Sequence, residues 1–438
     1  MKVPAFSLFI LLACLAVRSS SCAEPTPTPT PVPVALDPIF AGASPWETAV
    51  ADFVQQNPNA SFHWLSAAKD TAQSNRKGLS LFDLPVNQVV VQFTRGKVSG
   101  ISVLFYNRGD AGDIPQDQFE ALEARCEKTL SDLTKATPAV RGRDPRNAVK
   151  ASGLVWKTDQ SDYLMEYSIT KTAAVPFRAE FIRLTVTPPE KQKGLVEGAL
   201  AASQVTAKFN GPAHVKKDQD GDVWIDDIPM VDQGEKGYCV VATAERVMRY
   251  YGIRVDEHEL AQIANTSATK GTSNAAMFES LQKLCNRLRV KTRSIVNFDT
   301  KRMNTLIDDY NRTALKGKRA EEINPNVPSL TEVYQQMDSN ILRETLTKYP
   351  AEMDRVFRLF QRHIDTGIPV LWSVMIGVLP QSKDPKGFGG HTRLIIGYNA
   401  KSREIIYSDS WGMGHEKKRM PLVDAWTMTI GANTIEPL

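Results

Sequence analysis

The stretch DQGEKGYCVVATAERVMRYYG, residues 232 to 252, decides how the second half of the chain is interpreted. A glycine-containing loop runs into Cys239, and the residues that follow have the spacing of an amphipathic helix. Gly252 is of the residue type that commonly ends a helix. The pattern predicts that Cys239 lies in the first turn of a helix whose apolar stripe is Ala244, Val247, Met248 and Tyr251.

A cysteine at this position has the surroundings that a nucleophile needs. The thiolate is the reactive form, and an unperturbed thiol, with a pKa of about 8.5, is mostly protonated at neutral pH. The unpaired N–H groups and partial positive charge of a helix N-terminus favour the thiolate. Gln233, six residues earlier, carries an amide group that can stabilise an oxyanion beside the sulfur. We interpret Cys239 as a nucleophile, and the alternative interpretation is a small buried core residue.

A nucleophilic thiol also needs an imidazole, and the chain contains six histidines. His391 follows GFGG and precedes an apolar strand, so the glycines allow a close backbone approach where the strand begins. His258 lies at the start of a charged, capped helix, where we expect exposure to solvent. We therefore expect His391 to be the base, against the alternative of a structural histidine at a strand end.

A third polar group usually orients the imidazole in such a site. Asp409 lies 18 residues after His391, near the end of the next predicted strand, and a hairpin would bring the two side chains together. Asn399 and Asp424 are weaker alternatives. The glutamine, cysteine, histidine and aspartate each lie in a loop or at an element edge that suits its role, and we interpret them together as a catalytic set.

The composition divides the chain into five segments. They are a signal peptide (1–23), a Pro/Thr-rich linker (24–37), an N-terminal α+β accessory domain (38–200), a second linker (201–222) and a catalytic domain (223–438). Lys2, an apolar run and a small-residue cleavage site indicate export to the periplasm, the cell envelope or the medium. A lipid anchor at Cys14 or Cys22 is an alternative that the flanking residues do not favour.

Both large segments combine helices with strands. In the first, residues 87–107 predict two strands around a turn, residues 117–136 predict a helix, and three strands follow between 151 and 188. In the second, helical patterns precede three strands between 368 and 411. This order predicts an α+β fold with an antiparallel sheet and helices on one side of it. The charged helical stretch 299–365 has the character of an insertion.

Charge and cysteine content exclude several classes of protein. The net charge is +4, and removal of the signal peptide with Lys2 and Arg18 leaves +2, so we expect no nucleic-acid partner. Three cysteines would remain, too few for a disulfide framework, and Cys126 on a helical stripe is expected in a core. DQDGD (218–222) is interpreted as a turn rather than a calcium loop, because its glycine is misplaced. We expect no transmembrane segment after the signal peptide.

Several motifs resemble those of papain-fold cysteine peptidases. QGEKGYC (233–239) has the Gln-to-Cys spacing of six found in papain-like enzymes, and DSWG (409–412) resembles their NSWG, with Asp409 in place of asparagine. The closer similarity is to the bacterial C39-like peptidases. The stretches that resemble their successive motifs are IPMVDQGEKGYCVVATAERVMRYYG (228–252), KGTSNAAMFESLQKL (270–284), GIPVLWSV (367–374) and GGHTRLIIGYN (389–399).

The resemblance covers about residues 225–435 and implies a papain-like fold with a helical half and an antiparallel sheet. It implies that Gln233 stabilises the oxyanion, Cys239 is the nucleophile, His391 is base and then acid, and Asp409 orients His391. The reaction would be hydrolysis of a peptide or protein through a thioester, with no metal or other cofactor.

Two departures from the family pattern leave the substrate open. Val240 stands where papain-like enzymes carry tryptophan, and no nucleotide-binding motif of the transporter-fused members occurs. The alternative functions are a cell-wall amidase or a transglutaminase-type acyl transfer on the same scaffold, and a non-catalytic peptide-binding domain. The segment 38–200 is then an accessory or partner-binding module, with a prosegment as the alternative, and association with the cell envelope is compatible with export.

Overall fold

A computed structural model provides the structure of the chain. The residues that it describes are 32–40, 44–141, 148–189, 209–234, 237–266, 274–319, 323, 329–379 and 387–438. Pro33–Leu438 is one compact unit. The predicted signal peptide lies outside the described residues, as do most of the first predicted linker and the first part of the second. The predicted domain boundaries therefore stay predictions.

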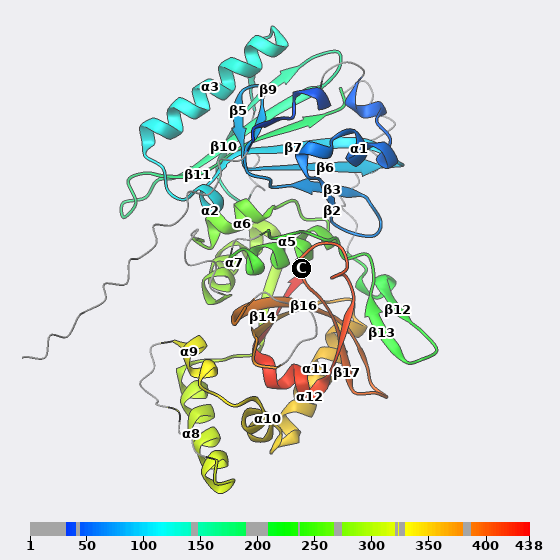
Figure 1. The fold of residues 1–438 in the computed structure, drawn as a ribbon, viewed down its shortest axis with the longest axis vertical. Helices are drawn as coiled ribbons and strands as arrows, with labels where there is room; N and C mark the ends of the chain where they lie inside the picture. The colour runs from blue at the N-terminus through cyan, green and yellow to red at the C-terminus, as the bar shows by residue number, and fades with distance from the viewer. Residues whose placement is uncertain are drawn as a thin grey trace, which may run out of the picture. The chain divides into compact units, whose positions relative to one another are not determined.

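The N-terminal region is built on an antiparallel sheet (Figure 1). Within the described residues, the strand order of this sheet is β2 (His63–Trp64), β3 (Thr71–Ser74), β6 (Gln88–Thr94), β7 (Lys97–Asn107), β11 (Arg178–Thr187), β10 (Asp162–Thr170), β9 (Ala151–Lys157) and β8 (Ala139–Val140). A smaller sheet joins β1 (Val34–Ala35), β4 (Leu79–Leu81) and β5 (Leu84–Val86). The predicted hairpin at 87–107 and the three later strands are confirmed.

One long helix, α3 (Gln116–Thr134), lies across this sheet (Figure 1). Its predicted stripe is buried at Phe119, Cys126 and Leu130, so the interpretation of Cys126 as a core residue is confirmed. Before the sheet, a 3-10 turn (Pro45–Glu47) precedes the short helix α1 (Val50–Gln56). The short helix α2 (Arg108–Ala111) follows β7, and its Gly109 lies against Tyr238, the residue before Cys239.

The C-terminal region contains a second antiparallel sheet. Among the described residues, its strand order is β12 (Val215–Lys217), β13 (Asp222–Ile225), β16 (Gly389–Asn399), β15 (Val370–Ile376), β19 (Thr429–Pro437) and β14 (Val290–Val296), with β17 (Glu404–Ser408) paired to β16 and β18 (Lys418–Pro421) paired to β17. The predicted turn at 218–222 connects β12 to β13. β16 is central, since it pairs with β13, β15 and β17.

Helices cover both faces of this sheet, and not one face as predicted. Leu371, Leu394 and Ile396 pack with α5 (Cys239–Tyr250), whereas their neighbours Val370, Trp372 and Ile395 pack with α11 (Pro350–Asp365). Successive residues of a strand point to opposite faces, so the two helices lie on opposite faces. The strands are nearly continuous apolar runs, as expected for a sheet that is buried on both faces.

The remaining helices extend these layers. They are α6 (Glu257–Ile263), α7 (Asn274–Leu288), α8 (Thr300–Lys316), α9 (Leu330–Gln335), α10 (Ser339–Thr347) and α12 (Leu422–Met428). The described parts of the stretch 299–365 are largely helical, as predicted, and α8 to α10 share a core with Met375 and Val378 at the end of β15. The capping box predicted for α6 is present, with Asp256 accepting from the N–H of Glu259 and the Glu259 carboxylate from the N–H of Asp256.

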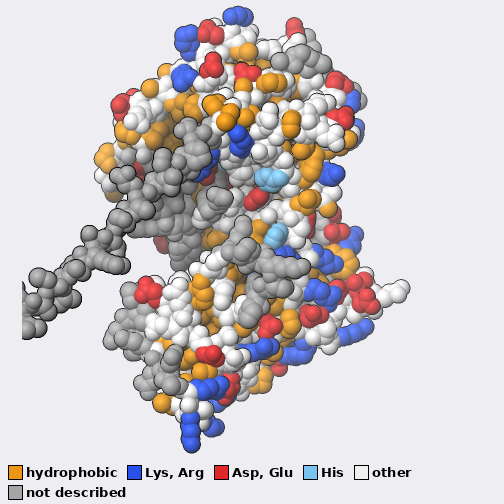
Figure 2. Space-filling view, in the orientation of Figure 1, with side chains coloured by type: hydrophobic (Ala, Val, Ile, Leu, Met, Phe, Trp, Pro, Cys, Tyr) orange, Lys and Arg blue, Asp and Glu red, His pale blue; other side chains and the backbone are white. Residues whose placement is uncertain are grey.

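The surface carries both signs of charge. Lys, Arg, Asp and Glu side chains are interspersed on the face shown in Figure 2. No helix among the described residues has the length and apolar character that crossing a bilayer would require.

Candidate active site

Cys239 is the first residue of α5, as the glycine-containing loop and the apolar stripe predict. No side chain caps this helix, because Tyr238 at the N-cap position makes no capping hydrogen bond. The backbone N–H groups of the first turn, which have no partner within the helix, therefore lie near the sulfur. The backbone groups of Val240 and Thr392 hydrogen-bond the Cys239 thiol, which is only partly buried.

His391 lies near the start of β16, two residues after the strand begins at Gly389. Its Nε2 lies 2.7 Å from Oδ1 of Asp409, just beyond the end of β17, and both side chains are buried. His391 also hydrogen-bonds the Cys239 side chain. Because Nε2 is engaged with the carboxylate, the bond to sulfur falls to Nδ1. The structure thus brings Cys239, His391 and Asp409 into one hydrogen-bonded row.

The electrostatics of this row favour its charged form. Burial raises the pKa of the Cys239 thiol, but the hydrogen bond and charge of His391 outweigh burial, and the pKa lies below its ordinary value. Burial lowers the pKa of His391, whereas Asp409 and Cys239 raise it, and the result is a raised pKa. Burial likewise raises the pKa of Asp409, and His391 and Arg393 bring it below its ordinary value. All three shifts favour a thiolate–imidazolium pair beside a carboxylate.

Gln233 is buried in the loop before α5. Its backbone N–H donates to the carbonyl oxygen of Ser410 at 3.0 Å, which ties this loop to the segment after Asp409. Its side-chain Oε1 is buried and has no hydrogen-bond partner among the described residues. Gln233 is thus held in place by its backbone, and the oxygen of its side-chain amide bonds to no other described residue.

Asn399 and Asp424, the weaker alternatives to Asp409 as the residue that orients His391, interact with other side chains. Asn399 donates to Oδ1 of Asp222 at 2.7 Å, and Asp424 pairs with Arg343 at 2.8 Å. The expectation that His258 is solvent-exposed is wrong. His258 is buried, with Nε2 at 3.3 Å from Oε1 of Gln88, because the N-terminal sheet packs over the start of α6.

Two further residues of the site were not expected from sequence. Arg393 is fully buried, and its Nε lies 3.1 Å from Oδ2 of Asp409. Trp411 stacks on the His391 ring, with centroids 4.6 Å apart and planes 21° apart. A signal for Arg393 was present, since a cation two residues after His391 in an apolar strand shares its face of the sheet.

Arg246 is a third unexpected residue, buried on α5. Its Nε donates to the Pro229 carbonyl at 2.9 Å, Nη1 to the Asp409 carbonyl at 3.0 Å, and Nη2 to Oγ of Ser408 at 2.6 Å. One guanidinium therefore joins the cysteine helix, the segment that leads to Gln233 and the end of β17.

The N-terminal region contacts the residues next to both Gln233 and Cys239. The buried Tyr238 donates from its hydroxyl to Oδ1 of Asn107 at 3.2 Å. Asp232 lies 3.0 Å from Nε2 of His63, and its carbonyl accepts from Nε2 of Gln73 at 3.3 Å. The accessory sheet thus supports the loop that carries the candidate site.

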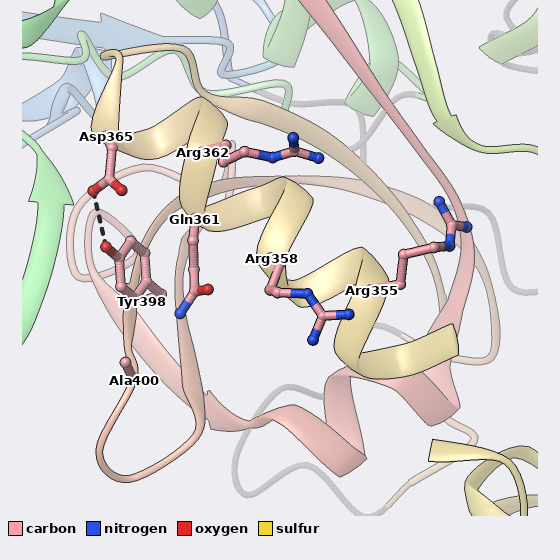
Figure 3. A pocket seen from close by; sticks show the side chains of 7 residues that line it. All are labelled: Arg355, Arg358, Gln361, Arg362, Asp365, Tyr398 and Ala400. Carbon is pink, nitrogen blue, oxygen red and sulfur yellow. Dashed lines mark hydrogen bonds between the residues drawn. The ribbon is translucent and has the colours of Figure 1, made fainter. Parts of the chain in front are cut away.

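A surface cavity of about 460 Å³ lies elsewhere, along α11. Figure 3 shows Tyr398 hydrogen-bonded to Asp365 on its wall. None of the four candidate residues lines this cavity. The described residues contain no group of three or more His, Cys, Asp or Glu side chains that could hold a metal ion.

Comparison with known proteins finds similarities for the C-terminal region. No curated protein matches the chain. Among solved structures, the chain resembles xylellain, a cysteine protease from Xylella fastidiosa, with a TM-score of 0.27 and 14% sequence identity, over 53% of this chain and 90% of that chain. Residues 225–431 match the model of the Peptidase C39-like family, and the expected α+β fold with an antiparallel sheet is confirmed. The C-terminal region, over just under half of the chain, is thus similar to the Peptidase C39-like family.

Proposed function

We propose that the chain is an exported cysteine peptidase that hydrolyses peptide bonds through Cys239, His391 and Asp409. The hydrogen-bonded row of these three side chains is the observation that carries the proposal. The similarity to this family supports a cysteine peptidase and hence a peptide or protein substrate. Export is proposed from the character of residues 1–23, which lie outside the described structure.

In the proposed first step, the Cys239 thiolate attacks the carbonyl carbon of the scissile bond. The carbonyl π electrons move to oxygen, and this oxyanion accepts hydrogen bonds from the Cys239 backbone N–H and the Gln233 amide. The carbon–nitrogen bond then breaks, and the leaving nitrogen takes the proton of His391. A thioester on Cys239 and a free amine result.

In the second step, His391 accepts a proton from water as that water attacks the thioester. The carbon–sulfur bond breaks, the acid product leaves, and the thiolate–imidazolium pair is restored. Asp409 takes no proton in either step. Its carboxylate holds Nε2 of His391 at 2.7 Å, so Nδ1 stays directed toward the sulfur and the reacting atoms.

The decisive experiment compares alkylation of Cys239 by iodoacetamide across pH in the native chain and in His391→Ala, followed by peptide mass spectrometry. We expect fast alkylation well below the pH at which a free thiol titrates, and a return to ordinary thiol behaviour in the variant. Cys126 is the internal control, because burial raises its pKa to about 12. A slow rate with an ordinary thiol titration in the native chain would contradict the proposal.

Hydrolysis of casein, lost in Cys239→Ala, would then establish peptidase activity. Reactive Cys239 with activity only on peptidoglycan, or only with an amine as acceptor, would replace hydrolysis of proteins by one of the other acyl-transfer reactions. A native Cys239 that alkylates fast and yields no turnover on any of these substrates would favour a peptide-binding role.

A further inference from the structure

The carboxylate of Asp409 has two cationic neighbours, and not only the histidine of the row. Oδ1 lies 2.7 Å from Nε2 of His391 and also accepts a hydrogen bond from Nε of Arg393 at 3.3 Å, while Oδ2 lies 3.1 Å from the same Nε in an ion pair. Neither Asp409 nor Arg393 exposes its side chain to solvent. A buried carboxylate and a buried guanidinium each require an opposite charge, because the loss of hydration is otherwise uncompensated.

Aromatic rings hold the Arg393 guanidinium in this position. Its central carbon lies 4.8 Å from the ring centroid of Tyr407, 5.8 Å from that of Trp411 and 5.9 Å from that of Trp372. Cations are attracted to the faces of such rings, most strongly where water is excluded. Trp411 also stacks on His391, so one ring contacts both cationic neighbours of Asp409.

We propose that Arg393 is a positioning residue of the active site, which acts through Asp409 and makes the buried row electrically neutral. The inference rests on the proposed function. In the active form the row holds a thiolate on Cys239, an imidazolium on His391, a carboxylate on Asp409 and a guanidinium on Arg393. Within these four side chains, two negative and two positive charges alternate.

Removal of the guanidinium charge should raise the pKa of both Cys239 and His391. The site would become net negative, so the Cys239 thiolate would form only at higher pH. The Asp409 carboxylate would no longer be neutralised by Arg393, so it would stabilise the His391 imidazolium more strongly, and His391 would keep its proton to higher pH. Both limbs of the pH profile should therefore move upward together. A general loosening of the core would instead lower the rate at every pH.

The other charged groups that act on Asp409 stay in place in such a variant. Lys418 on β18 favours the carboxylate. Arg246 on α5 donates to the Asp409 backbone carbonyl, and its charge interacts with the Asp409 carboxylate and, more weakly, with Glu416. They are common to all variants, so a difference between variants at position 393 reports on Arg393 alone.

The test compares Arg393→Gln, which keeps a polar donor and loses the charge, with Arg393→Lys, which keeps the charge. The readouts are the pH profile of Cys239 alkylation and that of kcat/KM on casein. In Arg393→Gln we expect alkylation near pH 6 to fall about three- to tenfold and both limbs of the kcat/KM profile to move to higher pH. In Arg393→Lys both limbs should stay where they are in the native chain.

Three results would overturn the inference. They are a uniform loss of rate in Arg393→Gln with unmoved limbs, an equal shift in the Gln and Lys variants, and failure of both variants to fold, which would make Arg393 a core residue only. The proposed function fails separately, through an unreactive Cys239 in the native chain. A native chain with a reactive Cys239 and variants with unmoved limbs would retain the peptidase and reject the role of Arg393.

Discussion

Asp409 sets the range of pH in which the candidate site holds its charged pair. The pKa of Cys239 lies below its ordinary value and that of His391 above it, and both shifts favour the thiolate–imidazolium form. Hydrolysis should rise as pH passes the lowered pKa and fall as pH passes the raised one. The two apparent values belong to the coupled pair rather than to either residue alone.

The first prediction concerns Asp409→Asn. Asparagine retains the shape and loses the charge that helps to raise the pKa of His391, so the alkaline limb of kcat/KM should move to lower pH. At neutral pH we expect a fall of about a hundredfold or more, since the imidazolium loses its counter-charge. The direction is opposite to that expected for Arg393→Gln. An alkaline limb that does not move in a folded variant would contradict this account.

The second prediction separates Gln233 from the nucleophile. In Gln233→Ala, kcat should fall about 10²–10³-fold, because one oxyanion donor is lost. Alkylation of Cys239 by iodoacetamide creates no oxyanion, so its rate should change little. Gln336→Ala is a matched control, since Gln336 is exposed on the surface and its side-chain amide donates to the Glu332 carbonyl of its own helix. Equal losses of alkylation and hydrolysis in Gln233→Ala would assign Gln233 a structural role.

At the scale of elements, the start of α5 depends on a close contact with α2. The residue before Cys239, Tyr238, packs directly against Gly109, and a methyl group on that glycine would overlap the tyrosine ring. Tyr238 is buried, so it has little room to move. The position of the nucleophile is thereby coupled to a helix of the N-terminal region.

The third prediction follows from this contact. Gly109→Ala should reduce the free energy of unfolding by about 1–3 kcal/mol through overpacking, and should alter the alkylation rate of Cys239 as α5 shifts. Gly389→Ala is the control, because an added Cβ there meets no atom within 4 Å. Thermal unfolding with alkylation in parallel would measure both effects. Equal melting temperatures for the two variants would refute the coupling.

The elements were largely predictable from sequence because their patterns are local. The stripe on α3, the capping box of α6 and the hairpin of β6 and β7 each depend on residues close in sequence. The arrangement of helices on both faces of the second sheet was not, since a continuous apolar strand does not show which helix covers which face.

The candidate site shows the same division. Cys239, His391 and Asp409 were identifiable because each lies at an element edge, with a residue type that suits one step of thiol chemistry. The burial of His258 and the contact of Asn107 with Tyr238 depend on residues more than a hundred positions apart. No local pattern encodes such contacts, so they became visible only in the folded chain.

At the scale of the whole molecule, the N-terminal sheet and the C-terminal region share one compact unit from residue 33 onward. Arg183 of β11 pairs with Asp256 and with Glu259 of the α6 capping box. Ser168 of β10 donates to Oε1 of Gln262 at 2.8 Å. Together with the contacts of Tyr238 and Asp232, these bonds favour a permanent support over a removable prosegment.

The fourth prediction tests that view on a chain that begins at residue 209. Without the accessory sheet, Tyr238 and Asp232 lose the partners described above, so we expect a lower melting temperature and slower hydrolysis than in the longer chain. The comparison is to be made at equal protein concentration with casein and with Cys239 alkylation. Higher activity of the shortened chain would instead establish residues 38–200 as an inhibitory prosegment.

The buried Arg246 also limits how this protein can diverge by point mutation. Its three donors satisfy acceptors at Pro229, Ser408 and Asp409, which lie in three directions from one planar group. A lysine preserves the charge but lacks that fixed fork and the reach to serve all three. A change to lysine at this position would leave acceptors in the segments around Pro229 and Ser408 without a donor, so both segments would have to change with it. We therefore expect arginine at position 246 to be retained among related proteins where many surface residues have changed, because it connects the helix, the loop and the strand of the site.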